Sequence, residues 1–312
     1  MFFEGSEKKF ELISLGAGLR RRPEAFVQRL VDLAGAKIIS KISSDRLDAY
    51  LLSESSLFVS DDGLAMLTCG RTTLAKAAEF AIQELSPEKI DFLSFERKNE
   101  FFPHGQETDF YSDVRLLEKY VPGRSFRFGF SDEHHLMLFH LDKPFKPRAL
   151  DCTLEVLMYN LQGPAHGIFN AEQTLERVRE LTKLDQIFTG FTIDDYLFDP
   201  CGYSLNAVRG GEYYTVHVTP EESSSYVSFE TNVKLGDNIA TALRNVVEVF
   251  KPRSFDVIYF HPEHGLNAFA LAPYTCTNYV RQSLNCGFEV GFATYFALSD
   301  EPRPAVILED LL

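Results

Sequence analysis

One arrangement of predicted elements occurs twice in the 312-residue chain, about half its length apart. In each copy a turn joins two strands, an amphipathic helix follows, a proline ends the helix, and a third strand comes next. The first copy runs over residues 50–95 and the second over residues 214–260. Such a repeat predicts two similar halves, each built on the same supersecondary unit.

Most connections have the length of hairpins rather than of crossovers between parallel strands. We therefore expect mainly antiparallel sheets with helices on one face of each. Two further helices are predicted near residues 23–33 and 171–184. The uncovered apolar faces of the two halves can bury each other. Because no low-complexity linker separates the halves, we predict one domain over residues 1–312, with halves of roughly 1–150 and 151–312.

Composition argues against several classes of protein. With a net charge of −14, the chain has no basic stripe for binding nucleic acid. No uninterrupted apolar stretch predicts a membrane span, and MFFEGSEKKF lacks the pattern of a secretory signal. The five cysteines are odd in number and have no CxxC spacing, so neither a disulfide framework nor a metal site is expected. These features predict a reduced, cytoplasmic enzyme.

The segment LLSESSLFVS at residues 51–60 is unusual, because three serines and a glutamate interrupt an otherwise apolar strand. One interpretation is a polar hairpin turn, since serine clusters mark loops. The other is an internal cleavage site, in which the Ser55 hydroxyl attacks the carbonyl carbon of Glu54. The amide then becomes an ester, and elimination leaves an N-terminal pyruvoyl group. This chemistry requires a nearby base and oxyanion donors. Spacing alone leaves both interpretations open.

Five blocks of sequence carry a family resemblance. They are FFEGSEK at residues 2–8, YLLSESSLFVS at 50–60, TCG at 68–70, FDPCGYSLN at 198–206, and HVTPE followed by SYVSFETN within 217–232. In their order and separations these blocks closely resemble the eukaryotic S-adenosylmethionine decarboxylases. The resemblance covers nearly the whole chain and is weakest over about residues 100–150 and after residue 260. It implies an α+β fold, a four-layer α/β/β/α sandwich with two internally similar halves.

The resemblance implies a proenzyme that cuts itself between Glu54 and Ser55. Ser55 would become a covalent pyruvoyl cofactor, so neither pyridoxal phosphate nor a metal would be needed. His217 would be the base for elimination from the ester, and Ser204 would donate a hydrogen bond to the tetrahedral intermediate. Cys69 would protonate the substrate carbon after carbon dioxide leaves. Taken alone, a strand histidine, a turn serine and a lone cysteine are more often structural.

The resemblance also implies residues that bind S-adenosylmethionine. Phe3 and Phe198 would stack on the two faces of the adenine. Glu221 would bind the ribose hydroxyls, and the backbone near Leu52 would contact the adenine edge. Without the motifs, any of the 28 phenylalanines is a core residue by default. Two residues of the N-terminal block would assist processing and shape the site, namely Glu4 and Glu7.

Relatives from animals are activated by putrescine, which binds in a buried acidic cluster. The positions that match this cluster are Asp151, Thr153, Glu155 and Glu230. Nearby positions differ from those relatives. Leu67 replaces a lysine, Ser94 replaces an aromatic residue, Glu96 replaces a serine, and Asp199 replaces an asparagine. Lys9 replaces a leucine, and its ammonium either takes the place of the diamine or lies exposed on a polar strand face. The first alternative predicts little or no stimulation by putrescine.

Three functions remain open. The chain is an active decarboxylase that supplies the aminopropyl donor for spermidine and spermine, an inactive paralogue acting as a regulatory subunit, or a pyruvoyl enzyme acting on ornithine or arginine. Retention of the processing residues favours activity, and retention of the nucleoside-binding residues favours S-adenosylmethionine. The expected partners are this substrate, putrescine as a candidate activator, the two self-derived chains and, as an open assembly, a second copy in a homodimer. Neither nucleic acid nor a membrane is expected.

Overall fold

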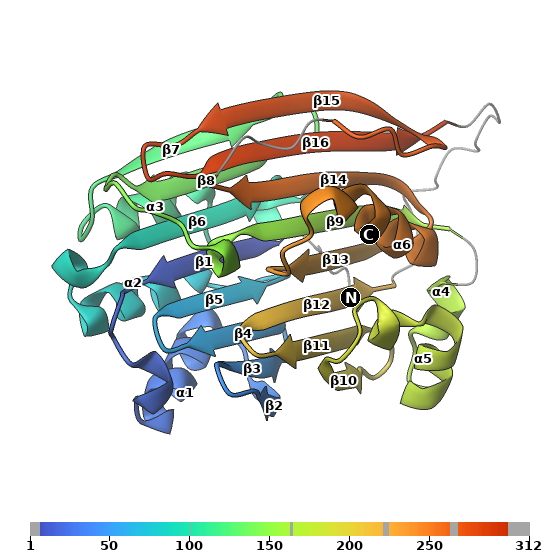
Figure 1. Cartoon of the computed structure of the whole chain (residues 1–312), viewed down its shortest axis with the longest axis horizontal. Coiled ribbons are helices and arrows are strands. Elements are labelled where there is room, and N and C mark those ends of the chain that lie inside the picture. The colour runs from blue at the N-terminus through green and yellow to red at the C-terminus, as the bar shows by residue number, and fades with distance from the viewer. Residues whose placement is uncertain (1–6, 101, 163–164, 221–224, 263–267, 299–312) are drawn as a thin grey trace.

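Two eight-stranded antiparallel sheets make up the centre of the protein (Figure 1). The computed structural model describes residues 7–100, 102–162, 165–220, 225–262 and 268–298. The strand order is β2-β3-β4-β5-β1-β6-β8-β7 in the first sheet and β10-β11-β12-β13-β9-β14-β16-β15 in the second. Each number in the second order is eight more than its counterpart in the first. The two halves therefore share one topology strand for strand, which confirms the predicted internal duplication.

The strands divide between the sheets by their position in the chain. The first sheet contains β1 (Lys8–Ile13), β2 (Ile38–Ser43), β3 (Leu47–Leu52), β4 (Ser55–Ser60), β5 (Gly63–Thr68), β6 (Phe92–Lys98), β7 (Gly123–Phe128) and β8 (Leu136–Leu141). The second contains β9 (Thr153–Leu161), β10 (Thr192–Leu197), β11 (Tyr203–Arg209), β12 (Glu212–Thr219), β13 (Tyr226–Thr231), β14 (Pro252–His261), β15 (Tyr274–Ser283) and β16 (Glu289–Ala297).

The helices lie on the outer faces of the sheets, as Figure 1 shows. They are α1 (Glu24–Ala34), α2 (Leu74–Leu85), α3 (Phe110–Leu117), α4 (Ala165–Ile168), α5 (Leu175–Thr182) and α6 (Ile239–Phe250). The helix predicted near residues 171–184 begins later, because the Thr174 side chain caps it by accepting a hydrogen bond from the Arg177 N–H at 3.2 Å. None of the helices in the described part of the chain has the length and apolarity needed to cross a membrane.

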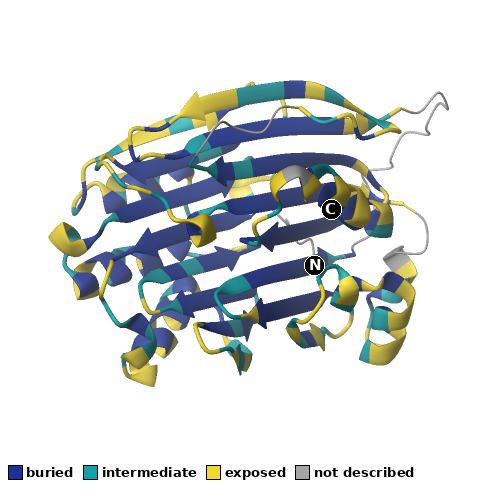
Figure 2. Ribbon diagram, viewed as in Figure 1, coloured by how far each residue is buried: buried dark blue, intermediate teal, exposed yellow. Residues whose placement is uncertain are grey.

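Period-two alternation of side chains produces the four layers. On β1, Phe10 and Leu12 pack with the helices, whereas Lys9 reaches Glu155 and Glu230 of the second sheet. The outer apolar clusters join each sheet to its helices, and a third cluster joins Phe92 of the first sheet to the second sheet. Burial is therefore continuous through the strands, while exposure concentrates on helices, loops and edges (Figure 2). The predicted α/β/β/α sandwich is confirmed.

A buried ion pair connects the central strands of the two sheets. Lys98 Nζ on β6 lies 3.0 Å from Asp256 Oδ2 on β14, and both side chains are almost fully buried. The Thr294 hydroxyl donates to Asp256 Oδ1 at 2.7 Å. Burial disfavours the carboxylate, but Lys98, His134 and Thr294 together outweigh burial and lower the pKa of Asp256 to about 2. Asp256 is therefore ionised at neutral pH, and it and Lys98 each find a partner on the other sheet.

We predict that Lys98→Met destabilises the protein by about 3–5 kcal/mol, because it leaves the Asp256 carboxylate buried without its cation. Lys98→Met combined with Asp256→Leu should recover much of this loss. Urea unfolding at pH 7 in an uncleaved Ser55→Ala background measures both effects. Arg71→Ala is the control, since Arg71 and Glu107 form an exposed pair 3.3 Å apart that contributes about 0–1 kcal/mol. An equal effect of Lys98→Met and Arg71→Ala would contradict the role of the buried pair.

Candidate functional site

The turn between β3 and β4 contains the predicted cleavage site. Leu52 pairs with Ser55, so Ser53 and Glu54 are the two turn residues. Ser55 has a φ of 142°, a conformation that residues with a side chain rarely adopt and that typically costs about 1–3 kcal/mol. Its hydroxyl is buried and has no hydrogen-bond partner among the described residues. An unbonded hydroxyl beside a strained backbone is suited to act as a nucleophile and fits the precursor of a pyruvoyl group.

The carbonyl group of Glu54 is already polarised by the main chain. Ser55 pairs with Thr68 of β5, and one step along this ladder the Cys69 N–H donates to the Glu54 carbonyl oxygen at 2.9 Å. A backbone N–H at this distance can stabilise negative charge that develops on the oxygen. The sequence motif indicated a role only for the Cys69 thiol, because the backbone contact depends on the register of the β4–β5 pair.

His217 and Ser204 lie opposite each other on β12 and β11. Ser204 Oγ is 2.8 Å from His217 Nδ1, so the structure brings this predicted pair together. Burial lowers the pKa of His217 to about 3 because the charged imidazolium is poorly solvated there. The ring is consequently neutral at physiological pH and has one nitrogen lone pair available as a base.

Three further residues surround the other nitrogen of His217. Nε2 lies 2.8 Å from Thr215 Oγ1 and 3.1 Å from Ser56 Oγ. Both hydroxyls also donate to Asn206 Oδ1, at 2.9 Å from Thr215 and 2.7 Å from Ser56. Ser56 belongs to the first sheet and directly follows Ser55, so this network connects the cleavage turn to the second sheet. The motifs did not indicate Ser56, Thr215 or Asn206, although period-two spacing places Thr215 beside His217.

The Cys69 thiol faces Glu7. Its Sγ donates to Glu7 Oε2 at 3.9 Å, and both residues are buried. Burial, reinforced by the charges of Glu155 and Glu230, raises the pKa of Glu7 to about 8. Burial and Glu7 together hold the pKa of Cys69 well above its ordinary value. Cys69 therefore remains a protonated thiol, the form that a proton donor requires.

The structure describes only part of the predicted substrate-binding set. Phe3, Glu4 and Glu221 lie outside the described residues. Leu52 is fully buried in the core between the first sheet and its helices. Phe198 follows β10, is partly exposed, and packs edge-on against Tyr196 with ring centroids 4.9 Å apart.

Lys9 is buried among acidic residues, so the alternative of an exposed lysine is wrong. Its Nζ lies 2.8 Å from Glu11, 2.8 Å from Glu155 and 3.0 Å from Glu230, and 3.4 Å from Thr153 Oγ1. Burial disfavours the ammonium, but these carboxylates hold the pKa of Lys9 well above its ordinary value. The lysine is therefore a permanent cation at the centre of the predicted cluster.

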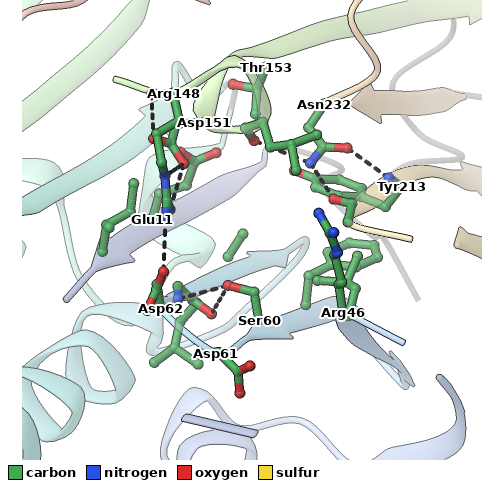
Figure 3. A pocket seen from close by; sticks show the side chains of 18 of the residues that line it. Glu11, Arg46, Ser60, Asp61, Asp62, Arg148, Asp151, Thr153, Tyr213 and Asn232 are labelled. Carbon is green, nitrogen blue, oxygen red and sulfur yellow. Dashed lines mark hydrogen bonds and ion pairs between the residues drawn. The ribbon is translucent and has the colours of Figure 1, made fainter. Parts of the chain in front are cut away.

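Two other acidic residues at this place behave differently. Glu96 is buried, and neither carboxylate oxygen has a hydrogen-bond partner in the described chain. Burial and the charge of Glu155 raise the pKa of Glu96 well above the ordinary value and favour its neutral form. Asp151 instead pairs with Arg148 at 3.0 Å, and Arg148 also contacts Asp62 at 2.9 Å (Figure 3).

An open cavity of about 570 Å³ lies beside this cluster. Glu11, Asp151 and Thr153 line it together with Tyr213 and Asn232, as Figure 3 shows. Ser55 and His217 are not among its lining residues. Since Glu11 and Thr153 also contact Lys9, the cavity gives solvent a route to the edge of the acidic cluster rather than to the cleavage turn.

One group of carboxylates has the spacing of metal ligands. Oxygens of Glu7, Glu155 and Glu230 all lie within 4.8 Å of one another. Two of the three, however, already bond the Lys9 ammonium. A cation supplied by the chain thus occupies the place where the charge of a metal ion would act.

Comparison with known proteins identifies the family. The family model described as adenosylmethionine decarboxylase matches residues 1–295. The chain belongs to this family. An S-adenosylmethionine decarboxylase proenzyme from Xenopus laevis is 36% identical over 279 residues, covering 83% of each chain. One from Trypanosoma cruzi is 34% identical over 279 residues, covering 83% of this chain and 75% of that protein.

A solved structure of the same family resembles this fold. The crystal structure of the Trypanosoma brucei AdoMetDC-delta26 monomer superposes with a TM-score of 0.61 at 26% sequence identity. The match covers 78% of this chain and 99% of that chain. Both the family and the sandwich fold predicted from the sequence blocks are therefore confirmed.

The depressed pKa of His217 predicts a specific dependence of stability on pH. Below its ordinary value of 6.5 the unfolded histidine binds a proton that the folded one does not, down to about pH 3. His217 therefore disfavours the folded state increasingly as pH falls, by about 2 kcal/mol between pH 7 and pH 5. Between pH 7 and pH 5 the free energy of unfolding of Ser55→Ala protein should therefore fall by about 2 kcal/mol more than that of the Ser55→Ala, His217→Gln double variant. Equal losses would contradict a neutral, buried His217.

Proposed function

We propose that the chain is a pyruvoyl-dependent S-adenosylmethionine decarboxylase that forms its cofactor from Ser55. The observation that carries the proposal is the turn itself. A buried, unbonded hydroxyl follows a peptide whose carbonyl oxygen accepts from the Cys69 N–H at 2.9 Å, and the backbone φ at Ser55 is 142°. Relaxation of this strain contributes to breaking the peptide bond.

Processing begins when Ser55 Oγ forms a bond to the Glu54 carbonyl carbon. The Glu54–Ser55 C–N bond breaks, and the hydroxyl proton passes to the departing nitrogen, which gives an ester and a free amine. His217 then removes the Ser55 α-proton. The Cβ–Oγ bond breaks, so Glu54 leaves as a carboxylate and a dehydroalanine remains. Water hydrolyses its imine tautomer, releasing ammonia and leaving the pyruvoyl group at the start of residues 55–312.

The residues around the turn support this division of roles. The Cys69 N–H stabilises the oxyanion at Glu54 in the first step, and Ser204, held on His217, is the second donor. The neutral His217 is available as the base in the second step without first losing a proton.

In turnover, the pyruvoyl ketone supplies the electron-withdrawing chemistry that pyridoxal phosphate supplies in other decarboxylases. Cys69 holds the proton that the substrate carbon receives after carbon dioxide leaves, and Glu7 orients the thiol. Phe3, Phe198 and Glu221 hold the nucleoside, and Glu4 completes the N-terminal part of the site. The product is the aminopropyl donor for spermidine and spermine. A reducing cytoplasm suits this chemistry, since none of the five cysteines forms a disulfide in the described part of the chain.

A carbon dioxide assay separates this function from its two alternatives. Purified protein should release carbon dioxide from carboxyl-labelled S-adenosylmethionine but not from ornithine or arginine, and Ser55→Ala should remain uncut and inactive. Release from an amino acid alone would favour the retargeted enzyme. No release from any substrate, with the chain still intact, would favour the regulatory paralogue.

Cys69→Ala should separate processing from turnover. The backbone N–H at residue 69 is retained, so the chain should still cut itself. Loss of the thiol proton should lower kcat by about 10²–10⁴-fold. Electrophoresis measures the first effect and steady-state kinetics the second. Full activity of the cut Cys69→Ala protein would show that another group protonates the substrate carbon.

We also propose that Lys9 replaces putrescine as the activating cation. Its ammonium contacts Glu11, Glu155 and Glu230 at 2.8–3.0 Å. Buried carboxylates repel one another and cannot all remain ionised without a cation. Because Lys9 is tethered to β1, this compensation is independent of any free diamine.

Millimolar putrescine should therefore stimulate the unmodified enzyme little or not at all. Lys9→Leu should lower activity roughly tenfold or more, which corresponds to about 1.4 kcal/mol of lost charge interaction, and putrescine should restore it. Lys119→Leu, which changes an exposed lysine on the surface, is the control. Strong stimulation of the unmodified enzyme by putrescine would overturn the proposal.

A further inference from the structure

The proton on the His217 ring has a definite position. A neutral imidazole carries one N–H and one lone pair, and the nitrogen that keeps the lone pair is the one that can act as a base. We propose that Asn206 is a positioning residue that places the proton on Nε2 and leaves the lone pair on Nδ1. This inference rests on the proposed function of His217 as the base in processing.

The amide oxygen of Asn206 accepts from Ser56 Oγ at 2.7 Å and from Thr215 Oγ1 at 2.9 Å. An amide oxygen has two lone pairs and no proton, so both hydroxyls must be donors in these contacts. Each hydroxyl has a single proton. Neither Ser56 nor Thr215 therefore has a proton left to give to His217.

Nε2 of His217 lies 2.8 Å from Thr215 Oγ1 and 3.1 Å from Ser56 Oγ, and both oxygens present only lone pairs toward it. Nε2 must then be the donor. Because burial keeps the ring neutral, Nδ1 carries the lone pair, and the Ser204 hydroxyl donates to it across 2.8 Å.

The reversed orientation of the Asn206 amide satisfies fewer hydrogen bonds. If Nδ2 of Asn206 faced the Ser56 and Thr215 hydroxyls, only one of these hydroxyls could donate to Nε2. The second hydroxyl could then donate only to the first, but the two oxygens are 3.5 Å apart, too far for a good hydrogen bond. Either orientation leaves one amide atom of Asn206 without a partner in the described chain, and in the observed orientation that atom is Nδ2. The orientation that satisfies both hydroxyls is therefore favoured, in a place where polar atoms are shielded from water.

The consequence for processing is directional. The lone pair lies on the Ser204 side of the ring, so Ser204 must release Nδ1 before His217 can take the Ser55 α-proton. A Ser204 hydroxyl that turns from Nδ1 to the tetrahedral intermediate accomplishes this release in the same movement. With the proton on Nδ1 instead, the lone pair moves to Nε2 beside Thr215 and Ser56, so Nδ1, the proposed base on the Ser204 side, is lost. Loss of a general base slows a reaction by about 10²–10⁴-fold.

The tautomer can be measured without any turnover. In Ser55→Ala protein with ¹⁵N-labelled histidine, the two ring-nitrogen shifts of His217 distinguish Nε2–H from Nδ1–H, and His217→Gln assigns the signals. The proposal predicts Nε2–H. Asn206→Leu frees both hydroxyl protons and should move the ring toward Nδ1–H. Ser56→Ala is the matched control, because Thr215 still donates to Asn206 and the ring should keep Nε2–H.

Processing rates supply the second measurement. In chains that retain Ser55, Asn206→Leu should slow formation of the pyruvoyl chain by about 10²–10⁴-fold. Asn206→Asp also accepts from both hydroxyls, so it should keep Nε2–H and process faster than Asn206→Leu. An Nδ1–H ring in Ser55→Ala protein, an unchanged tautomer in Asn206→Leu, or an Asp variant as slow as the Leu variant would each overturn the proposal. Failure of the unmodified chain to process would contradict the proposed function but not the tautomer, which is read in uncut protein.

Discussion

The hydrogen bond from the Cys69 N–H to the Glu54 carbonyl oxygen fixes the geometry on which the proposed cleavage depends. It exists because β4 lies between β3 and β5, with Ser55 paired to Leu52 on one side and to Thr68 on the other. Two ladders hold the residue after the turn, so the chain cannot relax the unusual φ of Ser55 without breaking sheet hydrogen bonds. The same register places Cys69, whose thiol is the proposed proton donor in turnover, next to this turn.

Polar contact between the two sheets is the second feature that the structure depends on. Ser56 meets Asn206 and His217, Lys9 meets Glu155 and Glu230, and Lys98 meets Asp256. Each of these side chains leaves its own sheet and finds its partner on the other, because a buried polar group without a partner is costly. The sheet interface is thus both the second core of the fold and the place where its proposed chemistry occurs.

Local sequence predicted most of the fold. The apolar spacing of α2 and the turn at Lys251, which has a φ of 45° before Pro252 begins β14, are readable within a few residues. The motifs also indicated Ser55, Cys69, Ser204 and His217. Ser56, Thr215 and Asn206 were not predictable, because their roles depend on how strands distant in sequence align across the interface. The environment of Lys9 was left open for the same reason, since an ammonium is stable there only with carboxylates from β9 and β13.

The most direct test of the account is the mass of the denatured protein before and after borohydride reduction. The account predicts two chains, residues 1–54 and 55–312, with the larger gaining the mass of two hydrogen atoms as its pyruvoyl ketone is reduced. A single chain that persists after prolonged incubation would contradict the account, as would a larger chain that begins with an unmodified serine.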